Sequence, residues 1–380
     1  MITYKLSEIA RSTKGKKPKS VSKEKADGFE IPYVDIKAFE KGIVDNYTNG
    51  ENCTFCKPDD VLIVWDGARC GFVGRGVEGA IGSTLAKISS DKYTNDFLFY
   101  FLQSKYKVLN RNPRGVGIPH IEPNLLWNFE IPDVDKPTQQ AIVARIEALF
   151  AELDKAAEHL RTAQQQLKTY RQAVLNHWLN NEDGKWEMVK LGEVAEMCLG
   201  KMLDKNKNKG TYQPYLRNVN VRWGSFDLDD LLEMKFEESE QDRYGIQIGD
   251  LIMCEGGEPG RCAIWNAIVP NMKIQKALHR IRVKNLIYNK FVYYLFSLYA
   301  QNGRLEKYFT GTTIKHLTGQ SLKSIEIPLP PLTDQHRIVQ EIESRLSQAE
   351  AAEASIAEAL QKTEALRQSI LKKAFSGELV

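Results

Sequence analysis

The sequence has no long apolar segment, few cysteines and almost no net charge. Its most apolar runs, such as Phe97 to Leu102 and Phe291 to Ala300, are much shorter than the about 20 residues that a membrane-spanning helix needs. The first residues, Met1 to Lys5, lack the apolar region of a secretion signal. Six cysteines in 380 residues do not form a disulfide scaffold, so we expect a cytoplasmic protein with reduced thiols and no membrane partner.

Basic and acidic residues nearly balance, at 52 and 49, which gives a formal net charge of +3. The protein as a whole therefore lacks a field strong enough to hold nucleic acid, and any such partner must be bound by local patches. Apolar residues make up 42% and charged residues 27%, which excludes a disordered or collagenous chain. Because a domain typically has about 150 residues, the length predicts two or three domains.

An internal repeat divides the chain into two halves. The ten residues from Thr138, Thr-Gln-Gln-Ala-Ile-Val-Ala-Arg-Ile-Glu, match Asp-Gln-His-Arg-Ile-Val-Gln-Glu-Ile-Glu from Asp334, at a shift of 196 residues. The segments Lys5 to Ala10 and Lys190 to Ala195 also match, but at a different shift, so loops in the globular parts differ in length. A period this long indicates duplication of a domain followed by a helix, rather than a solenoid.

Each half ends in a long helix with the apolar seam of a coiled coil. Over residues 138–180 apolar residues recur in alternating steps of four and three. Residues 333–375 repeat this spacing, except that Leu346 lies next to the expected seam position at Arg345 and Thr363 fills one position. Each predicted helix has about 40 residues and a length of about 60 Å. Both helices are nearly neutral, so we interpret them as spacers and docking surfaces rather than DNA-binding elements. The predicted seam residues are Ile142, Ile146, Leu149, Leu153, Ala156, Leu160, Ala163, Leu167, Tyr170 and Val174, followed in the second helix by Ile338, Ile342, Leu346, Ala349, Ala352, Ile356, Ala359, Thr363, Leu366 and Ile370.

The segments before the helices are predicted to be two similar globular domains of mixed α/β (α+β) class. Val61 to Trp65 and Leu251 to Cys254 have the composition of buried strands, while Asp96 to Lys107 and Asn289 to Ala300 have that of apolar helices. The predicted boundaries are a first domain at 1–137, a long helix at 138–180, a second domain at 181–332, and a second long helix with the C-terminal tail at 333–380.

Equivalent parts of both domains are locally basic and are candidates for contact with nucleic acid. Residues 1–25 contain eight basic groups against two acidic ones, and residues 200–222 contain six against one. Loop lysines suit phosphate contact, whereas arginine and asparagine carry the donors and acceptors that read purine edges. A solvated surface loop is the alternative interpretation. The candidate residues are Lys14, Lys16, Lys17, Lys19, Lys201, Lys205, Lys207, Arg217, Asn218, Asn220 and Arg222.

A second pair of loops, Arg111 to His120 and Thr310 to His316, contains glycine and polar residues. Glycine allows the backbone to approach a phosphate closely. We interpret the histidine of each loop as structural rather than catalytic. These loops add Arg114, Thr312, Thr313 and Lys315 to the predicted DNA-binding residues.

No catalytic or metal-binding pattern in the sequence is complete. Phe72 to Gly76 has the Phe-x-Gly-x-Gly pattern that resembles the S-adenosylmethionine loop of methyltransferases, but the chain has no Asn/Asp-Pro-Pro-Tyr/Phe loop. Cys53 and Cys56 have the spacing of half a zinc site, and no second pair of ligands follows. We therefore predict no catalytic residue, metal or cofactor in this chain. A self-contained DNA methyltransferase and a coiled-coil adaptor without nucleic acid are the alternatives.

Five segments carry a resemblance to a known family, namely Gly200 to Lys205, Pro214 to Asn220, Gly249 to Trp265, Ile325 to Leu332 and Leu366 to Gly377. Over its whole length the chain resembles the specificity subunit of type I restriction–modification systems. The first domain departs most from the second, since Trp65-Asp66-Gly67 stands where the second has Cys254-Glu255-Gly256. Such a difference is expected if the two domains bind different halves of a target.

The resemblance implies two target recognition domains, each binding one half of a split, asymmetric sequence in double-stranded DNA. It also implies an antiparallel intramolecular coiled coil that docks two modification subunits, which carry S-adenosylmethionine, and motor-nuclease subunits, which use ATP and Mg²⁺. Catalysis would lie in those partners, and the complex would act in phage defence. Duplication gives a separate reason for antiparallel pairing, because a pseudo-twofold arrangement satisfies both seams within one chain.

Overall fold

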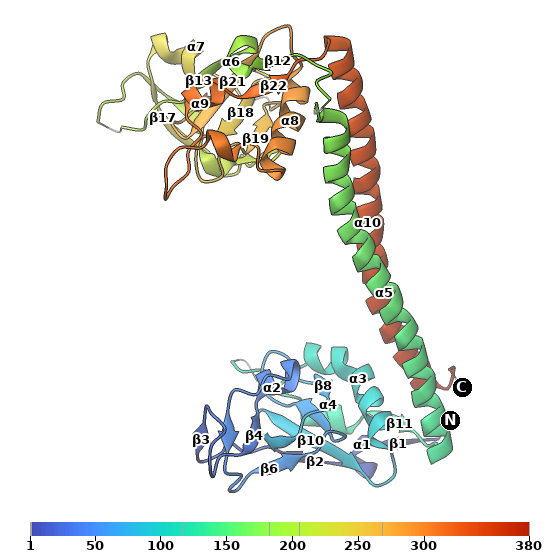
Figure 1. The fold of residues 1–380 in the computed structure, drawn as a ribbon. Helices are drawn as coiled ribbons and strands as arrows, with labels where there is room; N and C mark the ends of the chain where they lie inside the picture. The colour runs from blue at the N-terminus through green and yellow to red at the C-terminus, as the bar shows by residue number, and fades with distance from the viewer. Residues whose placement is uncertain (1, 116, 182, 205, 268, 380) are drawn as a thin grey trace. The chain divides into compact units, whose positions relative to one another are not determined.

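The computed structural model describes residues 2–115, 117–181, 183–204, 206–267 and 269–379 (Figure 1). Its contacts divide the chain into two units, of which the first joins segments from opposite ends of the sequence. The first unit comprises Met1–Arg161 and Ala357–Val380, and the second comprises Thr162–Ile356. Each unit therefore combines one globular domain with a part of each long helix.

The two long helices are α5 (Lys136–Leu179) and α10 (Leu332–Ser376). The carboxylate of Asp135 accepts a hydrogen bond from the backbone N–H of Thr138 at 3.0 Å, which caps the start of α5. Gly377 follows α10 with a φ of 82°, the left-handed conformation that commonly ends a helix. The two predicted long helices are confirmed, with ends that differ from the prediction by one or two residues.

The long helices are antiparallel. In the first unit, Ile146 near the start of α5 shares a hydrophobic core with Leu371 near the end of α10. In the second unit, Leu175 near the end of α5 shares a core with Ile338 near the start of α10. The chain thus pairs the beginning of each helix with the end of the other, so each globular domain packs against parts of both.

The buried face of the helices differs in register from the predicted seam. Ala157 is buried where the prediction had Ala156, and Tyr170 and Leu366 are 39% and 50% exposed. In a straight helix the apolar face drifts around the axis relative to a strict seven-residue repeat. The step from Leu153 to Ala157 has four residues where the prediction had three, and this step keeps the apolar residues on the buried face. The other principal seam residues are buried or half-buried, namely Ile142, Ile146, Leu149, Leu153, Leu160, Leu167, Val174, Ile338, Ile342, Ile356 and Ile370.

The first globular domain contains three sheets. Its elements are β1 (Thr3–Lys5), α1 (Leu6–Ile9), β2 (Ala10–Lys14), β3 (Val21–Ser22), β4 (Ile31–Val34), α2 (Ile36–Lys41), β5 (Tyr47–Thr48), β6 (Thr54–Cys56), β7 (Val61–Val64), β8 (Val73–Gly74), β9 (Gly79–Ile81), β10 (Leu85–Ser90), α3 (Asn95–Arg111), α4 (Pro123–Trp127) and β11 (Glu130–Pro132). The sheets have the orders β2-β10-β7-β8, β3-β5-β4-β9-β6 and β1-β11. Phe97 of α3 and Ile88 of β10 belong to one buried core, which joins this helix to the four-stranded sheet.

The second globular domain repeats this plan. Its elements are β12 (Met188–Lys190), α6 (Leu191–Val194), β13 (Ala195–Leu199), β14 (Thr211–Leu216), β15 (Val221–Arg222), β16 (Ser225–Phe226), β17 (Leu232–Phe236), α7 (Gln241–Tyr244), β18 (Leu251–Cys254), β19 (Cys262–Ile264), β20 (Lys273–Ile274), β21 (Leu278–Val283), α8 (Asn289–Gln301), α9 (Gly319–Lys323) and β22 (Glu326–Pro328), with short 3₁₀ turns at Asn218–Asn220, Glu238–Glu240 and Glu306–Tyr308. The sheets have the orders β13-β21-β18-β19, β17-β14-β20, β12-β22 and β15-β16.

The two domains share a four-stranded sheet and one parallel strand pair, and they differ in the remaining strands. The antiparallel sheet β2-β10-β7-β8 corresponds to β13-β21-β18-β19, and the parallel pair of β4 with β9 corresponds to the parallel pair of β14 with β20. The predicted mixed α/β class, with two similar domains and two long helices packed together, is therefore confirmed. No helix in the described ranges has the length and apolar character needed to cross a membrane.

Candidate nucleic-acid interface

An equivalent glycine begins the basic loop of each domain. The N–H of Gly15 donates to the carbonyl of Leu85 at 2.9 Å, and that of Gly200 donates to the carbonyl of Leu278 at 3.0 Å. A Cβ at either glycine would lie 2.2 or 2.3 Å from a backbone carbonyl oxygen, so only glycine fits. The two loops, which are difficult to align in sequence, therefore start at the same place in the fold.

The basic loop of the first domain leaves three lysines free. Lys16, Lys17 and Lys19 are exposed, and none of them forms an ion pair within the part of the chain that the structure describes. Lys14 differs, because its ammonium lies 2.8 Å from the carboxylate of Asp66. Exposed, unpaired ammonium groups suit contact with phosphate, which requires charge but little geometry.

Asp66 joins the two predicted loops of the first domain. Besides contacting Lys14, its mostly buried carboxylate lies 2.7 Å from Nδ1 of His120. The backbone of His120 pairs in turn with that of Arg114, whose side chain is exposed. The histidine thus holds the loop in place. Asp66 was not among the site residues predicted from the sequence, although its position two residues after a buried strand was a usable signal.

The basic loop of the second domain is less available than its composition indicates. Lys201 is only 8% exposed, and its ammonium donates to the carbonyl of Lys235 at 3.0 Å and to the carboxylate of Glu240. It therefore stabilises the domain interior and is not part of the interface that we propose. Lys207 is exposed, while Lys205 lies outside the described residues.

Two of the predicted base-reading residues hold their own loop together. Asn220 is buried, and its side chain accepts from the N–H of Arg217 at 2.8 Å and donates to the carbonyls of Asp227 and Asp230 at 2.9 and 3.2 Å. The guanidinium of Arg217 donates to both the carbonyl and the carboxylate of Asp230. Local sequence shows which residues have recognition chemistry, but only the fold shows that these groups are already occupied.

Asn218 and Arg222 occupy intermediate positions. Asn218 donates to the carbonyl of Gly256 at 2.7 Å and accepts from Arg261 at 3.2 Å. The side chain of Arg222 is 51% exposed, and its pairing with Asp227 at 3.3 Å is open to solvent. Because an exposed ion pair contributes little free energy, Arg222 can exchange this partner for a base edge or a phosphate.

The second loop of the second domain meets the Asn218 loop at Gly256. Gly256 forms a bridge with His316, as Asp66 does with His120 in the first domain. Asp66 therefore corresponds to Gly256, and the alignment of Asp66 with Glu255 in the sequence is wrong by one residue. Thr312, Thr313 and Lys315 are exposed on this loop, and Lys315 lies 3.8 Å from Glu306 in a solvent-open pair. In both domains the fold therefore brings the second loop against the turn that follows the equivalent buried strand.

The segment that resembles a cofactor loop is packed into the first domain. Phe72 contacts the rings of Phe39 and Tyr106 edge-on, with ring centroids 5.8 and 5.7 Å apart. A Cβ at Gly74 would meet the Phe39 ring at 2.7 Å, and Arg75 is paired with Asp96. These contacts show that residues Phe72 to Gly76 contribute to the packing of the first domain around strand β8. No group of three or more potential metal ligands occurs in the described ranges.

Comparisons with known proteins identify the family. A family model described as the type I restriction modification DNA specificity domain matches residues 1–160 and 183–361. The MjaVIII specificity subunit of Methanocaldococcus jannaschii, a type I restriction enzyme subunit, is 26% identical over 368 residues, which cover 90% of this chain and 84% of that protein. The EcoKI specificity subunit of Escherichia coli K12 is 26% identical over 351 residues, with coverages of 85% and 75%.

Two solved structures have the same fold. One comes from work on complex assembly and conformational transition of the type I R-M system, with a TM-score of 0.73, 20% identity and coverages of 99% and 98%. The other is the HsdS subunit from Thermoanaerobacter tengcongensis, with a TM-score of 0.62, 20% identity and coverages of 99% and 97%.

Proposed function

The chain belongs to the family of specificity subunits of type I restriction–modification systems, and we propose that each of its globular domains binds one half of a bipartite, asymmetric target in double-stranded DNA. In this family the specificity subunit selects the DNA sequence, and catalysis with its cofactors lies in the modification and motor-nuclease subunits. We place this activity in the cytoplasm, with domains at 1–137 and 181–332 as the recognition domains.

The observation that carries the proposal is the duplicated junction of two loops. Gly15 and Gly200 start a basic loop at the same strand end, and the Asp66–His120 and Gly256–His316 bridges position a second loop in each domain. A surface built twice on the same framework, with different side chains, suits recognition of two different half-sites. The residues that we assign to it are Lys16, Lys17, Lys19, Arg114, Lys207, Arg222, Thr312, Thr313 and Lys315, with Lys14 and Asn218 at its edge.

The exposed residues of the long helices support the docking of two modification subunits. Tyr170 and Leu366 are separated by 196 residues, the shift of the repeat, and each is a large apolar side chain exposed on its helix. Two equivalent exposed apolar positions on antiparallel helices suit the binding of two copies of one partner. Each copy would pack against one of the two helices. Motor-nuclease subunits would join the same assembly.

The proposal is tested by mapping methylated DNA in cells that express this chain with its partner subunits. A split motif with an unread spacer is expected. Exchanging the first domain for that of another specificity subunit should change one half of the motif and leave the other half unchanged. A contiguous motif, or a motif that does not change with the domain, would contradict two-domain recognition. In the isolated chain, tight binding of S-adenosylmethionine would support the methyltransferase alternative instead.

A further inference from the structure

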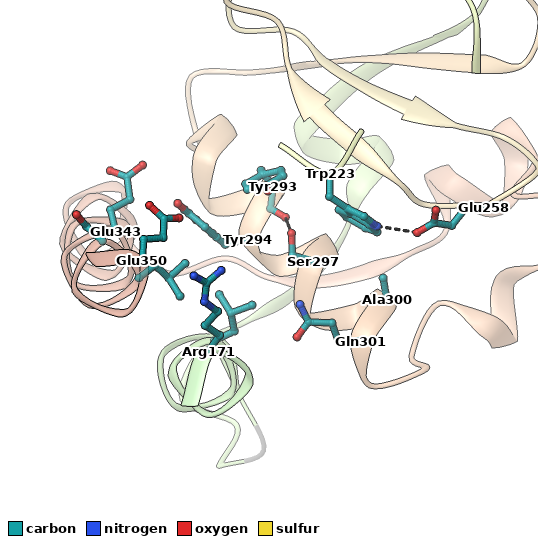
Figure 2. A pocket seen from close by; sticks show the side chains of 13 residues that line it. Arg171, Trp223, Glu258, Tyr293, Tyr294, Ser297, Ala300, Gln301, Glu343 and Glu350 are labelled. Atoms are coloured by element: carbon teal, nitrogen blue, oxygen red, sulfur yellow. Dashed lines mark hydrogen bonds between the residues drawn. The ribbon is translucent and has the colours of Figure 1, made fainter. Parts of the chain in front are cut away.

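In the second unit, a cavity of about 800 Å³ lies between α8 and the two long helices (Figure 2). Tyr293 and Tyr294 of α8 form an aromatic wall, and the indole of Trp223 continues it, held by a 2.7 Å hydrogen bond from its Nε1 to Glu258. Glu343 and Glu350 of α10 also line the cavity, and Tyr294 points toward them. None of these residues belongs to the nucleic-acid interface described above.

The equivalent corner of the first unit can be located residue by residue. In that unit the side-chain carbonyl of Gln139 accepts from the N–H of Thr94 at 2.9 Å, and in the second unit that of Gln335 accepts from the N–H of Tyr288 at 2.7 Å. These two bonds tie α3 to α5 and α8 to α10 in the same register. Positions on α3 therefore correspond to positions on α8 at a shift of 194 residues, and the long helices correspond at 196.

In the first unit larger side chains occupy this corner. Tyr106 and Gln103 stand at the positions of Ala300 and Ser297, both of which line the cavity in the second unit. Phe150 stands at the position of Leu346 and packs edge-on against Tyr100, with ring centroids 5.9 Å apart. The cavity thus results from smaller side chains in the second half, on a framework that both halves share.

The first unit also places a guanidinium in this corner. Arg75 lies 4.7 Å from the ring centroid of Phe99, which corresponds to Tyr293, and 3.6 Å from the carboxylate of Glu147, which corresponds to Glu343. Strand register places Ile264 at the position of Arg75. A second cavity of about 300 Å³, lined by Ile264, shares Tyr293 and Glu343 with the larger one. The second unit thus keeps the aromatic and acidic walls and has Ile264 in place of the arginine. Its Glu343 pairs instead with Lys290, which stands at the position of Asp96.

The charges around the larger cavity are unbalanced. Arg171, its basic residue, donates to Glu353 at 2.8 Å and is thereby occupied. Glu258 pairs with Arg261, and Glu343 pairs with Lys290 at 2.6 Å. Glu350 forms no ion pair within the residues that the structure describes. An aromatic wall beside an uncompensated carboxylate favours a cation, and the acidic character disfavours a DNA phosphate.

We propose that this cavity receives an arginine side chain of one modification subunit. The inference rests on the proposed function, because both long helices that dock this partner line the cavity. A planar guanidinium can stack on Tyr293 or Tyr294 and pair with Glu350. Arg75 of the first unit shows the same chemistry, since it stacks on Phe99 and pairs with Glu147, the equivalent of Glu343. Because the first unit has larger side chains at the equivalent positions, the two modification subunits are held unequally.

Two variants of the full chain test this, each assembled with the modification subunits. Glu350→Gln removes the free carboxylate, and Ala300→Tyr introduces the side chain that fills the equivalent corner. Stepwise binding is measured by native mass spectrometry and by a sedimentation titration. Each variant should weaken one of the two binding steps about ten-fold and leave the other unchanged, since a charge-assisted hydrogen bond contributes about that much. The matched control is Glu364→Gln, an exposed glutamate elsewhere on α10.

A photo-cross-linking amino acid at position 300 identifies the occupant. We expect a cross-link to an arginine-containing peptide of the modification subunit, and charge reversal of that arginine combined with Glu350→Arg should restore binding. Parental affinity at both steps for Glu350→Gln and Ala300→Tyr, with thermal unfolding unchanged, would overturn the inference while leaving the methylated motif as evidence for the proposed function. Failure of the parental chain to bind any modification subunit would instead overturn both.

Discussion

Arg171 of α5 donates a hydrogen bond to Glu353 of α10 at 2.8 Å. Its repeat equivalent, Arg367, pairs instead with Asp154, which corresponds to Glu350 rather than to Glu353. The two long helices thus place their surface charges at positions that are not equivalent in the repeat. In the second unit this leaves Glu350 on the cavity wall, which gives the duplicated protein one asymmetric surface.

Neutralising Lys16, Lys17 and Lys19 to glutamine should weaken DNA binding by the assembled complex without changing the methylated motif. Each lost phosphate contact should reduce the slope of log affinity against log salt by about 0.9, because fewer counterions are released. Lys14→Gln should change this slope less, since the Lys14 ammonium already pairs with Asp66. A triple variant at the exposed Lys41, Lys57 and Lys107 is the control, and an unchanged slope in the first variant would contradict the assignment.

Arg222→Ala should change DNA specificity, whereas Asn220→Ala should change the stability of the second domain. Arg222 is exposed, so its removal should relax specificity at one base pair by about 1–3 kcal/mol and leave stability nearly unchanged. Asn220 is buried and bonded to three backbone groups, so its removal should lower the free energy of unfolding by about 1–3 kcal/mol. Methylation of a base-substituted target library and chemical denaturation distinguish the two. A parental motif in Arg222→Ala would exclude it as a reader.

The second unit should lose stability in mild acid because of His279. Burial lowers the pKa of this imidazole, whose Nε2 lies 2.8 Å from the carbonyl of Leu317 while its Nδ1 has no partner in the described residues. An unfolded histidine takes up a proton near pH 6.5, and the folded one resists it. The unfolding free energy that depends on His279 is therefore fully present above about pH 6.5 and decreases as pH falls below it.

Chemical denaturation at pH 7.5 and pH 5.5 checks this pH dependence. His279→Gln keeps a donor for Leu317 but cannot titrate, so it should have a smaller loss of stability between the two pH values than the parental chain. The exposed His316→Gln is the control and should retain the parental difference. Equal pH dependence in all three proteins would show that His279 is not responsible.

The antiparallel helices should act as a spacer between the two half-sites. Inserting one heptad between Ala156 and Ala163, with a matching heptad between Ala352 and Ala359, lengthens each helix by about 10 Å and preserves both buried faces. At about 3.4 Å per base pair, roughly three more unread pairs are expected, limited by the helical phase of the duplex. A four-residue insertion in one helix only should weaken assembly, because it breaks the seam.

Methylation of a library of half-site spacings measures the preferred spacer. The control has two seven-residue insertions in exposed loops outside the helices. This control protein should methylate sites with the parental spacing. If the helix-insertion protein assembles and methylates sites with the parental spacing, the helices do not set the distance.

Periodicity determined the long helices, because an apolar stripe over about 40 residues has few structural alternatives. The internal repeat in turn determined the two-domain plan, and the ends of both helices were predicted to within two residues. The predicted seam was wrong at some positions. Ala157 replaces Ala156 on the buried face because helix drift accumulates along the chain, and a list of apolar positions does not contain that rotation.

Residue type alone could identify recognition chemistry, but only the tertiary structure decided which groups are available. Lys16 and Lys201 follow equivalent glycines, yet Lys16 is exposed and Lys201 is buried against Glu240, a residue 39 positions away. Asn220 is likewise occupied by backbone groups that a turn brings to it. Local sequence specifies helices through contacts between near neighbours, whereas the availability of a charge depends on partners that only folding brings close.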